Sequence, residues 1–512
     1  MRPKSRSPRR STRSKPRQPR EALGRASTAR GRGGDGRLRP GRSSGAPLLR
    51  AAARQHRRRS RDAWHRRRSR DAWHRRRSRD AWHRRDRRGG GEVSDPFPRT
   101  DGWLHAEAVP LARIAEKVGT PVYVYSATAL AERYDALEAA FEGVGHLIAY
   151  SIKSNANLAV VHDLVERGAG VDVTSRGELF RALRAGADPA KIVYSGVGKR
   201  DDEIAAALEA GIKLFNVESR AELRRIDAVA GETGLEAPVA FRVNPDVDPE
   251  THPYISTGLR TSKFGIPIQE AVGAYAEAKA LAHVRVVGVD CHIGSQLTKL
   301  RPFGDALARV ADLVRELRDA GHAIEVIDVG GGLGVVYDEE RPPSMREYAA
   351  VVGDAVGGLN CEIILEPGRS ITANAGVFVT RVLYEKENED KHFVVVDGAM
   401  NDLIRPALYQ SFQRIEPVGP PRSELRTVDV VGPVCESGDF LAKQRRLPAL
   451  ERGDLLAVRS AGAYGFTMAS NYNGRPRCAE VLVRGGHWAV VREPESLDDL
   501  VRGESIPGDL VG

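Results

Sequence analysis

The feature that most restricts the fold is an alternation of short apolar segments with amphipathic segments between residues 147 and 365. The expected strands are 147–152, 170–173, 192–195, 213–217, 238–243, 286–292, 325–329 and 362–365. Helical periodicity between them predicts helices such as 156–166, 176–185, 201–210, 219–233 and 304–320. Eight strands separated by helices predict an α/β fold, a TIM-like (β/α)8 barrel, with a doubly wound sheet as the alternative.

After residue 375 the pattern changes to strands and turns without long helices. Apolar segments at 377–385, 392–397, 428–434, 454–459 and 478–483 predict a second, mostly β domain. We therefore expect the barrel to span 125–374 and the C-terminal β domain 375–512. The N-terminal segment 92–124 contains strand-like residues near Trp103 and at 122–125. We expect it to pack with the β domain.

Residues 1–91 form a basic tail with 33 Lys or Arg and 6 Asp or Glu, whereas the rest of the chain is acidic. Within it, Arg-Asp-Ala-Trp-His-Arg-Arg-Arg-Ser recurs with a nine-residue period that places Trp64, Trp73 and Trp82 equivalently. Few aliphatic residues accompany the charges, so the tail is predicted to be disordered. Nucleic-acid binding would rest on this tail alone and is not favoured. A start near Val93 is an alternative, which leaves the presence of the tail in the mature protein open.

Cysteine usage and hydropathy indicate the compartment. The four cysteines, Cys291, Cys361, Cys435 and Cys478, lack the Cys-x-x-Cys spacing of zinc sites and the density of disulfide-rich domains. No segment approaches the roughly 18 consecutive apolar residues of a membrane span. We expect a cytoplasmic protein with neither a metal site nor a membrane partner.

Lys153 ends the first expected strand, Leu147-Ile-Ala-Tyr-Ser-Ile-Lys153, and is the leading candidate for covalent chemistry. A lysine removed from water has a lowered pKa, and its free amine forms a Schiff base with an aldehyde. The alternative is a strand-end lysine whose ammonium group reaches solvent.

Other polar groups follow later strands, which matters because the carboxyl ends of barrel strands converge on one site. Asp172 and Ser175 follow the second strand, and His292-Ile-Gly-Ser295 follows the sixth. Gly330-Gly-Gly-Leu-Gly334 and Glu366-Pro-Gly-Arg369 follow the last two. The glycine run does not match the dinucleotide fingerprint Gly-x-Gly-x-x-Gly. Each motif alone is compatible with a turn or a packed core residue, but their recurrence at successive strand ends is not.

Together these groups meet the requirements of pyridoxal 5'-phosphate. Lys153 offers the amine for its aldehyde, His292 a platform for its ring, and Glu366 a partner for its pyridine nitrogen. Backbone N–H groups and a hydroxyl suited to a phosphate are predicted at Gly330, Gly331, Gly332, Ser295 and the turn Glu366, Pro367, Gly368, Arg369.

With these residues in view, the chain resembles the alanine-racemase-like (fold type III) pyridoxal-phosphate decarboxylases over roughly residues 97–505. The segments that carry the resemblance are Tyr150-Ser-Ile-Lys-Ser-Asn155, Thr257-Gly-Leu-Arg-Thr-Ser-Lys-Phe-Gly265, Cys291-His-Ile-Gly-Ser-Gln296, Gly330–Gly334, Glu366–Arg369, Gly432-Pro-Val-Cys-Glu-Ser-Gly-Asp439 and Ala463-Tyr-Gly465. They are most similar to members that convert meso-2,6-diaminopimelate to L-lysine and CO2, the last step of lysine biosynthesis.

The resemblance implies roles for individual residues. Lys153 would carry the cofactor, and Cys435 would return a proton to the substrate carbon. In the family this cysteine comes from the partner subunit, which implies a homodimer with shared active sites. Arg369, Arg405, Tyr409, Glu436 and Tyr464 match substrate-binding positions, and Tyr464 also contacts the cofactor.

Three alternatives remain open. One is a related decarboxylase of ornithine, arginine, lysine or carboxynorspermidine. Another is an amino-acid racemase, which would need a tyrosine base in the second domain. The third is a non-catalytic relative of the fold, against which the presence of Lys153, Glu366 and Cys435 argues.

Overall fold

The computed structural model of the chain describes residues 95–248, 262–389, 391–508. The predicted tail 1–91 and the first part of the segment Thr257–Gly265 therefore lie outside the described residues. No helix in the described ranges is long and apolar enough to cross a membrane.

Eight parallel strands close into a barrel, because the first strand, β5, pairs with both β6 and the last strand, β13. The barrel strands are β5 (His146–Ser151), β6 (Gly170–Val173), β7 (Ile192–Tyr194), β8 (Leu214–Val217), β9 (Ala237–Asn244), β11 (Val284–Asp290), β12 (Val326–Asp328) and β13 (Glu362–Leu365). A short strand, β10 (Ile266–Pro267), extends the sheet beside β9. The predicted barrel is confirmed.

Side chains of the barrel strands alternate between two environments, as the two-residue period of a strand requires. Leu147 and Ala149 of β5 pack in a cluster with residues from β7, β8, β9, β11, β12 and β13, inside the barrel. Ile148 and Tyr150 belong instead to the larger core that includes the helices. Because both faces are buried, the strands appear in the sequence as nearly continuous apolar runs.

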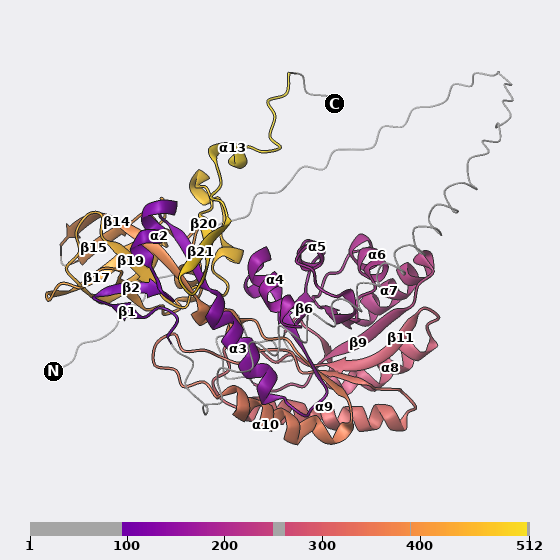
Figure 1. Cartoon of the computed structure of the whole chain (residues 1–512). Helices are drawn as coiled ribbons and strands as arrows, with labels where there is room; N and C mark the ends of the chain where they lie inside the picture. The colour runs from indigo at the N-terminus through magenta and orange to yellow at the C-terminus, as the bar shows by residue number, and fades with distance from the viewer. Residues whose placement is uncertain (1–94, 249–261, 390, 509–512) are drawn as a thin grey trace, which may run out of the picture. The chain divides into compact units, whose positions relative to one another are not determined.

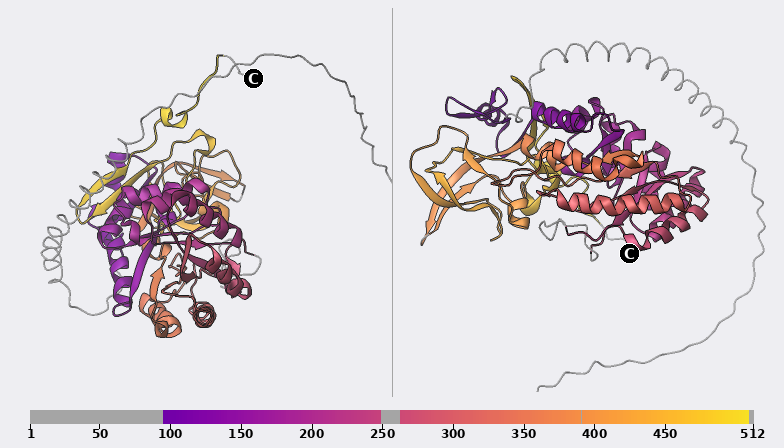
Figure 2. Two further views of the ribbon diagram at one scale, coloured as in Figure 1. Left: turned by 90° about the vertical axis from the view of Figure 1, so that its right-hand side faces the viewer. Right: turned by 90° about the horizontal axis from the view of Figure 1, so that it is seen from below.

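Helices surround the barrel (Figure 1). They are α3 (Ala127–Ala140), α4 (Leu158–Glu166), α5 (Arg176–Arg184), α6 (Asp201–Ala210), α7 (Arg220–Thr233), α8 (Ala271–Ala280), α9 (Arg301–Asp319) and α10 (Met345–Val356). Helices α9 and α10 run side by side (Figure 2), and α3, which precedes the first strand, packs between α10 and α4. Helix α4 begins two residues later than predicted because the Asn157 side chain accepts the N–H of Ala159 and caps it.

The second part of the described chain is mostly β, as predicted. Its strands are β4 (Val122–Ser126), β14 (Gly376–Asn388), β15 (Lys391–Val396), β16 (Ile415–Pro417), β17 (Leu425–Val431), β18 (Phe440–Pro448), β19 (Leu455–Val458), β20 (Ala479–Arg484) and β21 (His487–Arg492). Strand β4, from the N-terminal segment, lies in this sheet between β14 and β20. Buried residues from Phe97 to Val124 share one apolar core with Val377, Val418 and Val481.

Candidate active site

Lys153 lies in a single 3-10 turn (Ile152–Ser154) that directly follows β5, at the carboxyl end of the barrel. Its Nζ donates a hydrogen bond to Oδ2 of Asp172, 2.8 Å away, on the neighbouring strand β6. The Asp172 side chain is fully buried, whereas 39% of the Lys153 side chain is exposed. The amine is therefore fixed at one end of the barrel and remains accessible.

The expectation that burial lowers the pKa of Lys153 is wrong in this structure. Burial does act to lower this pKa, but the carboxylates of Asp172 and Glu366 act in the opposite direction and outweigh it. The pKa of Lys153 is raised as a result. Desolvation is predictable from the apolar strand alone, whereas the two acidic residues reach the amine only through the barrel.

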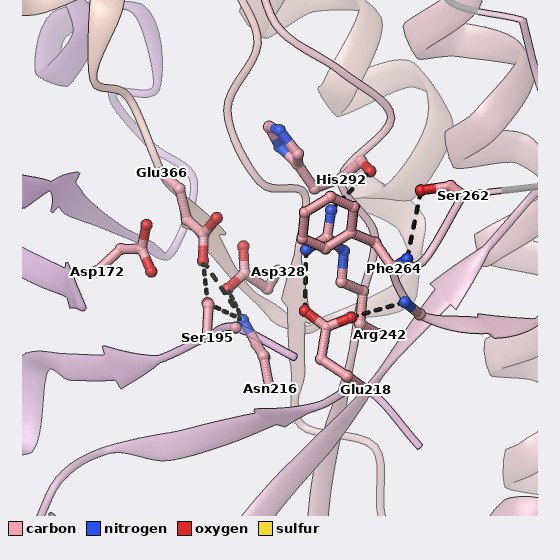
Figure 3. Close-up of polar contacts among 12 residues, drawn as sticks. Asp172, Ser195, Asn216, Glu218, Arg242, Ser262, Phe264, His292, Asp328 and Glu366 are labelled. Atoms are coloured by element: carbon pink, nitrogen blue, oxygen red, sulfur yellow. Dashed lines mark hydrogen bonds and ion pairs between the residues drawn. The ribbon is translucent and has the colours of Figure 1, made fainter. Parts of the chain in front are cut away.

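Glu366 follows β13 and lies in a buried polar network (Figure 3). Its Oε1 accepts hydrogen bonds from Ser195 Oγ at 3.2 Å and from Asn216 Nδ2 at 3.4 Å. The same Asn216 nitrogen donates to Oδ2 of Asp328 at 3.0 Å. Asn216 therefore bridges two carboxyl groups from neighbouring strands.

The carboxyl groups of this network have a strong affinity for protons. Burial, followed by the charges of Asp172 and Asp328, raises the pKa of Glu366 well above its usual range, although Lys153 and Arg242 oppose the change. Burial and the charge of Asp290 raise the pKa of Asp328 to about 8. Like charges packed in an apolar barrel cannot all ionise at neutral pH.

The Gly330–Gly332 turn follows β12 and packs tightly against the ends of β11 and β13. A Cβ atom at Gly331 would lie 2.1 Å from the backbone oxygen of Glu366, and Gly330 and Gly332 have φ angles of +65° and +115°. These positions require glycine. The N–H of Gly330 donates to Asp328 Oδ1 and that of Gly331 to His292 Nδ1. In this structure these two N–H groups order the turn, which differs from the phosphate contacts predicted for them.

His292 follows β11, and its Nδ1 accepts the Gly331 N–H at 3.1 Å. Burial, then the charges of Arg242 and Lys153, lower the pKa of His292 well below its usual range. The ring is therefore neutral, as an acceptor at Nδ1 requires.

Arg369 and Arg405 form a cationic group at the start of two short helices, α11 (Arg369–Thr372) and α12 (Arg405–Tyr409). Arg369 donates to Tyr337 Oη at 2.5 Å and to Ser295 Oγ at 3.1 Å. The Arg405 guanidinium lies over the ring of Tyr409, and its Nε is buried without a hydrogen-bond partner among the described residues. Across the described ranges, neither arginine has an ion pair with a carboxylate. The pair is therefore suited to an external anion.

Tyr464 brings the β domain to the lysine turn. Its N–H donates to the backbone oxygen of Ser154 at 2.7 Å, and Asn155 donates to the oxygen of Gly462 at 3.1 Å. The Arg369 guanidinium lies 4.9 Å from the centre of the Tyr464 ring. Segments far apart in the chain thus meet within two residues of Lys153.

Cys435 and Glu436 lie on an exposed loop of the β domain. The Cys435 N–H donates to Asn473 Oδ1 at 2.8 Å. Within the described part of the chain, no hydrogen bond or ion pair joins either residue to Lys153 or Arg369. The structure therefore brings together the other predicted residues but not these two.

Several polar residues that complete the site were not predicted from the sequence. Each of the eight strands places one at its carboxyl end: Lys153, Asp172, Ser195, Asn216, Arg242, Asp290, Asp328 and Glu366, in strand order. Each of these residues could have been predicted from the sequence as a single polar residue near the end of an apolar segment. Tyr337, which contacts Arg369, had no comparable signal.

The residues fit pyridoxal phosphate by their chemistry. An accessible amine and a buried carboxyl group lie at the ends of adjacent strands, near two arginines that form no ion pair with any described carboxylate. Two buried oxygens, Asp172 Oδ1 and Asn216 Oδ1, have no hydrogen-bond partner in the part of the chain that the structure describes. Such atoms are typical of a site that is completed by a bound molecule.

Comparison with known proteins decides the family. Residues 128–373 match the family described as pyridoxal-dependent decarboxylase, pyridoxal binding domain. The diaminopimelate decarboxylase of Pseudomonas aeruginosa is 55% identical over 412 residues, which cover 80% of this chain and 99% of that protein. The chain belongs to the diaminopimelate decarboxylase family.

Solved structures of diaminopimelate decarboxylases agree in fold. The Helicobacter pylori enzyme complexed with L-lysine is 43% identical, with a TM-score of 0.74 and coverage of 76% of this chain and 98% of that chain. The M. jannaschii enzyme in co-complex with L-lysine is 38% identical, with a TM-score of 0.77 and coverage of 81% and 99%. The predicted family, the enzyme class of pyridoxal-phosphate-dependent carboxy-lyases and the cofactor are confirmed.

Proposed function

We propose that the protein decarboxylates meso-2,6-diaminopimelate to L-lysine and CO2, the last step of lysine biosynthesis. The observation that carries the proposal is the placement of Lys153 and Glu366 at the ends of adjacent strands, beside two buried arginines that pair with no carboxylate of the described ranges. Pyridoxal phosphate bound to a lysine amine supplies a protonated ring that withdraws electrons from the carbon that loses CO2. The remaining steps are assigned to side chains of the chain.

Lys153 is proposed as the catalytic lysine and Glu366 as the partner of the ring nitrogen. The Asp172 carboxylate accepts a hydrogen bond from Lys153 Nζ at 2.8 Å, which holds the amine at the strand end and balances its positive charge. Ser195 and Asn216 donate to Glu366 and stabilise its ionised form. A positive charge on the ring nitrogen would also favour the ionised form of Glu366. With the cofactor bound, the proton would therefore be on the ring nitrogen and Glu366 would be a carboxylate. His292 is proposed to stack on the ring.

Phosphate and substrate carboxylates are proposed to bind at the cationic end of the site. Ser295, Gly332, Gly368 and Arg369 would hold the phosphate, with the conformation of the turn set by Gly330, Gly331 and Pro367. Arg369, Arg405, Tyr409 and Tyr464 would contact the substrate. Bidentate guanidinium groups suit the two carboxylates of diaminopimelate, and Glu436 would receive its distal ammonium group.

We also propose a homodimer in which the partner's loop completes each site. The support is that Cys435 and Glu436 are exposed on a β-domain loop, while the family resemblance gives them catalytic and substrate-binding roles. The Cys435 thiol would return a proton to the substrate carbon after CO2 leaves. Mixing inactive Lys153→Ala protein with inactive Cys435→Ala protein should restore part of the activity, because a mixed dimer contains one intact pair. Demonstrated subunit exchange without any return of activity would contradict the shared site.

Substrate choice tests the proposed function. CO2 release should be measured for meso-diaminopimelate, lysine, ornithine, arginine and carboxynorspermidine, with pyridoxal phosphate added. A buried arginine that loses its carboxylate partner costs about 2–5 kcal/mol, which is about 30-fold to several thousand-fold in relative efficiency. Diaminopimelate should therefore react fastest by at least that lower factor. Comparable rates on ornithine or arginine would move the assignment to a related decarboxylase, and no release on any substrate would favour a non-catalytic relative.

Two further expectations remain proposals. The described cysteines are all free thiols, which supports a reducing, cytoplasmic location. The division into a barrel at 125–374, a β domain at 375–512 and a β-domain-associated segment at 92–124 is supported by the pairing of β4 with β14 and β20.

A further inference from the structure

Arg242 of β9 is buried between the ends of two neighbouring strands (Figure 3). Its Nη1 donates to Oε1 of Glu218, the residue directly after β8, at 3.1 Å. Its Nη2 donates to the backbone oxygen of His292, which follows β11, at 3.3 Å. Only 9% of the Arg242 side chain and 3% of the Glu218 side chain are exposed. A buried ion pair of this kind adds little net stability, which indicates a positional role.

The ion pair of Arg242 and Glu218 also contacts residues 264 and 265, which lie in the described part of the segment Thr257–Gly265. Glu218 Oε2 accepts the N–H of Gly265 at 2.6 Å. The Arg242 guanidinium lies 4.7 Å from the centre of the Phe264 ring. Arg242 and Glu218 together thus connect the ends of three strands with residues 264–265.

His292 in turn contacts the glycine turn, so its position affects that of the turn. Its Nδ1 accepts the N–H of Gly331 at 3.1 Å, and Gly331 packs so closely on the backbone of Glu366 that no side chain fits between them. A proton on Nδ1 would remove the acceptor and place two donors against each other. The position of the turn therefore depends on which His292 nitrogen carries a proton.

We propose that Arg242 is a positioning residue that holds His292 in place and keeps its Nδ1 available as the acceptor for Gly331, while Glu218 moderates the charge of Arg242. The contacts that carry this inference are independent of the proposed function. Its consequence for catalysis rests on that function, because it requires that His292 and the glycine turn face the cofactor.

Charges around the ring support the inference. After burial, Arg242 and Lys153 lower the pKa of His292. Arg242 is itself faced by Glu218, Asp290 and Glu366. Loss of the Arg242 charge would leave these acids near the ring and raise the pKa of His292. Loss of the Glu218 charge would leave Arg242 less compensated and lower it. The two substitutions should therefore act with opposite signs.

Nuclear magnetic resonance of the imidazole nitrogens tests this on the full-length holoenzyme. The protein is labelled with 15N at histidine, and His292 is assigned by comparison with a His292→Gln variant. In the wild type, Nδ1 should remain unprotonated throughout the range in which the protein is folded. In Arg242→Met, the midpoint of protonation should rise by about one pH unit or more, and hydrogen exchange at Gly331 N–H should become faster. Arg242→Lys retains the charge and should preserve the unprotonated Nδ1.

The sign of the change separates a positioning role from a general structural role. In Glu218→Gln, which keeps an oxygen for Gly265, the midpoint should fall or stay below the accessible range. An unchanged His292 titration in folded Arg242→Met would overturn the proposal, as would a rise in both variants. If Arg242→Met does not fold, a rise in Glu218→Gln is sufficient to overturn it. The nitrogen signals do not depend on turnover, so failure of the substrate panel leaves this test intact.

Discussion

Replacement of Asp172 by asparagine should make Lys153 a more reactive amine toward an aldehyde. Asp172 is the principal cause of the raised pKa of Lys153, since its Oδ2 lies 2.8 Å from Nζ. Asparagine is nearly isosteric, and its oxygen still accepts from the ammonium group or from Ser151. The change therefore removes one charge with little change in volume.

The size of the effect follows from the geometry. At 2.8 Å, Coulomb's law gives about 1.5 kcal/mol with the dielectric constant of water and about 6 kcal/mol with an effective value of 20. Because 39% of the Lys153 side chain is exposed, solvent screens the pair and the lower figure applies more closely. We expect the pKa of Lys153 to fall by about one to two units.

The assay is the rate at which cofactor-free protein captures pyridoxal phosphate, followed by absorbance from pH 6 to 10. Only the uncharged amine attacks the aldehyde, so the rate rises as Lys153 loses its proton. Asp172→Asn should reach a given rate at a pH about one to two units lower than the wild type, which is about tenfold faster capture or more at neutral pH. Asp354→Asn, on the exposed face of α10, is the matched control and should leave the curve unchanged.

Affinity for the phosphate group is measured separately. Loss of a negative charge also favours binding of the phosphate group, and pyridoxine 5'-phosphate, which has no aldehyde, reports that effect alone. While the ammonium form of Lys153 predominates, a lower pKa multiplies the capture rate by a constant factor of about ten or more. A gain in capture rate no larger than the gain in affinity for pyridoxine 5'-phosphate would refute the conclusion that Asp172 sets the pKa of Lys153.

Three other predictions follow from the site and the fold. Lys153→Ala should reduce CO2 release to background, and borohydride reduction should add cofactor mass to the peptide containing residue 153 in the wild type only; labelling of the variant at another lysine with retained turnover would contradict the assignment. Asp328 has a pKa raised to about 8, so the folded protein holds its proton more tightly than the unfolded chain, and this stabilising contribution is lost as pH rises from about 4 toward 8. In cofactor-free protein, Asp328→Asn should therefore gain thermal stability over the wild type at pH 8 relative to pH 5, and an equal difference at both pH values would count against the raised pKa. Removal of residues 1–91 should leave kcat/KM within about twofold, because 412 residues of this chain already cover 99% of a relative; a large loss of activity in a protein that still unfolds cooperatively would show that the tail contributes to the site.

The strands of the barrel were predictable because burial of both strand faces produces continuous apolar segments in the sequence. Residues of β5 such as Leu147 and Ile148 face opposite sides of the strand, yet both are buried, so the strand is apolar throughout. The turn at Gly330–Gly332 was predictable for a related reason, since close packing and positive φ angles exclude other residues. These signals are local, and a single sequence contains them.

The interactions that set protonation states were not predictable, because they join residues far apart in the chain. Asn216 bridges Asp328 and Glu366, which are 112 and 150 residues away from it. Before the barrel closes, an asparagine in an apolar strand gives no indication of its partners. The error over Lys153 has the same origin: desolvation follows from one strand, but the opposing charge of Asp172 comes from another.

The acidic side chains and two of the basic side chains lie at different ends of the site. Asp172, Glu218, Asp290, Asp328 and Glu366 gather at the carboxyl ends of the barrel strands, where Lys153 and Arg242 are the cations that act on them. Arg369 and Arg405, on α11 and α12, have tyrosines around them, and neither forms an ion pair with a carboxylate that the structure describes. An excess of buried carboxyl groups favours a cation, and arginines without acidic partners favour an anion. A molecule with a protonatable ring nitrogen at one end and anionic groups at the other therefore has one orientation in which both ends meet opposite charge. Because barrel strands supply the acidic end and the short helices α11 and α12 supply the cationic end, the fold of both parts of the chain establishes this polarity.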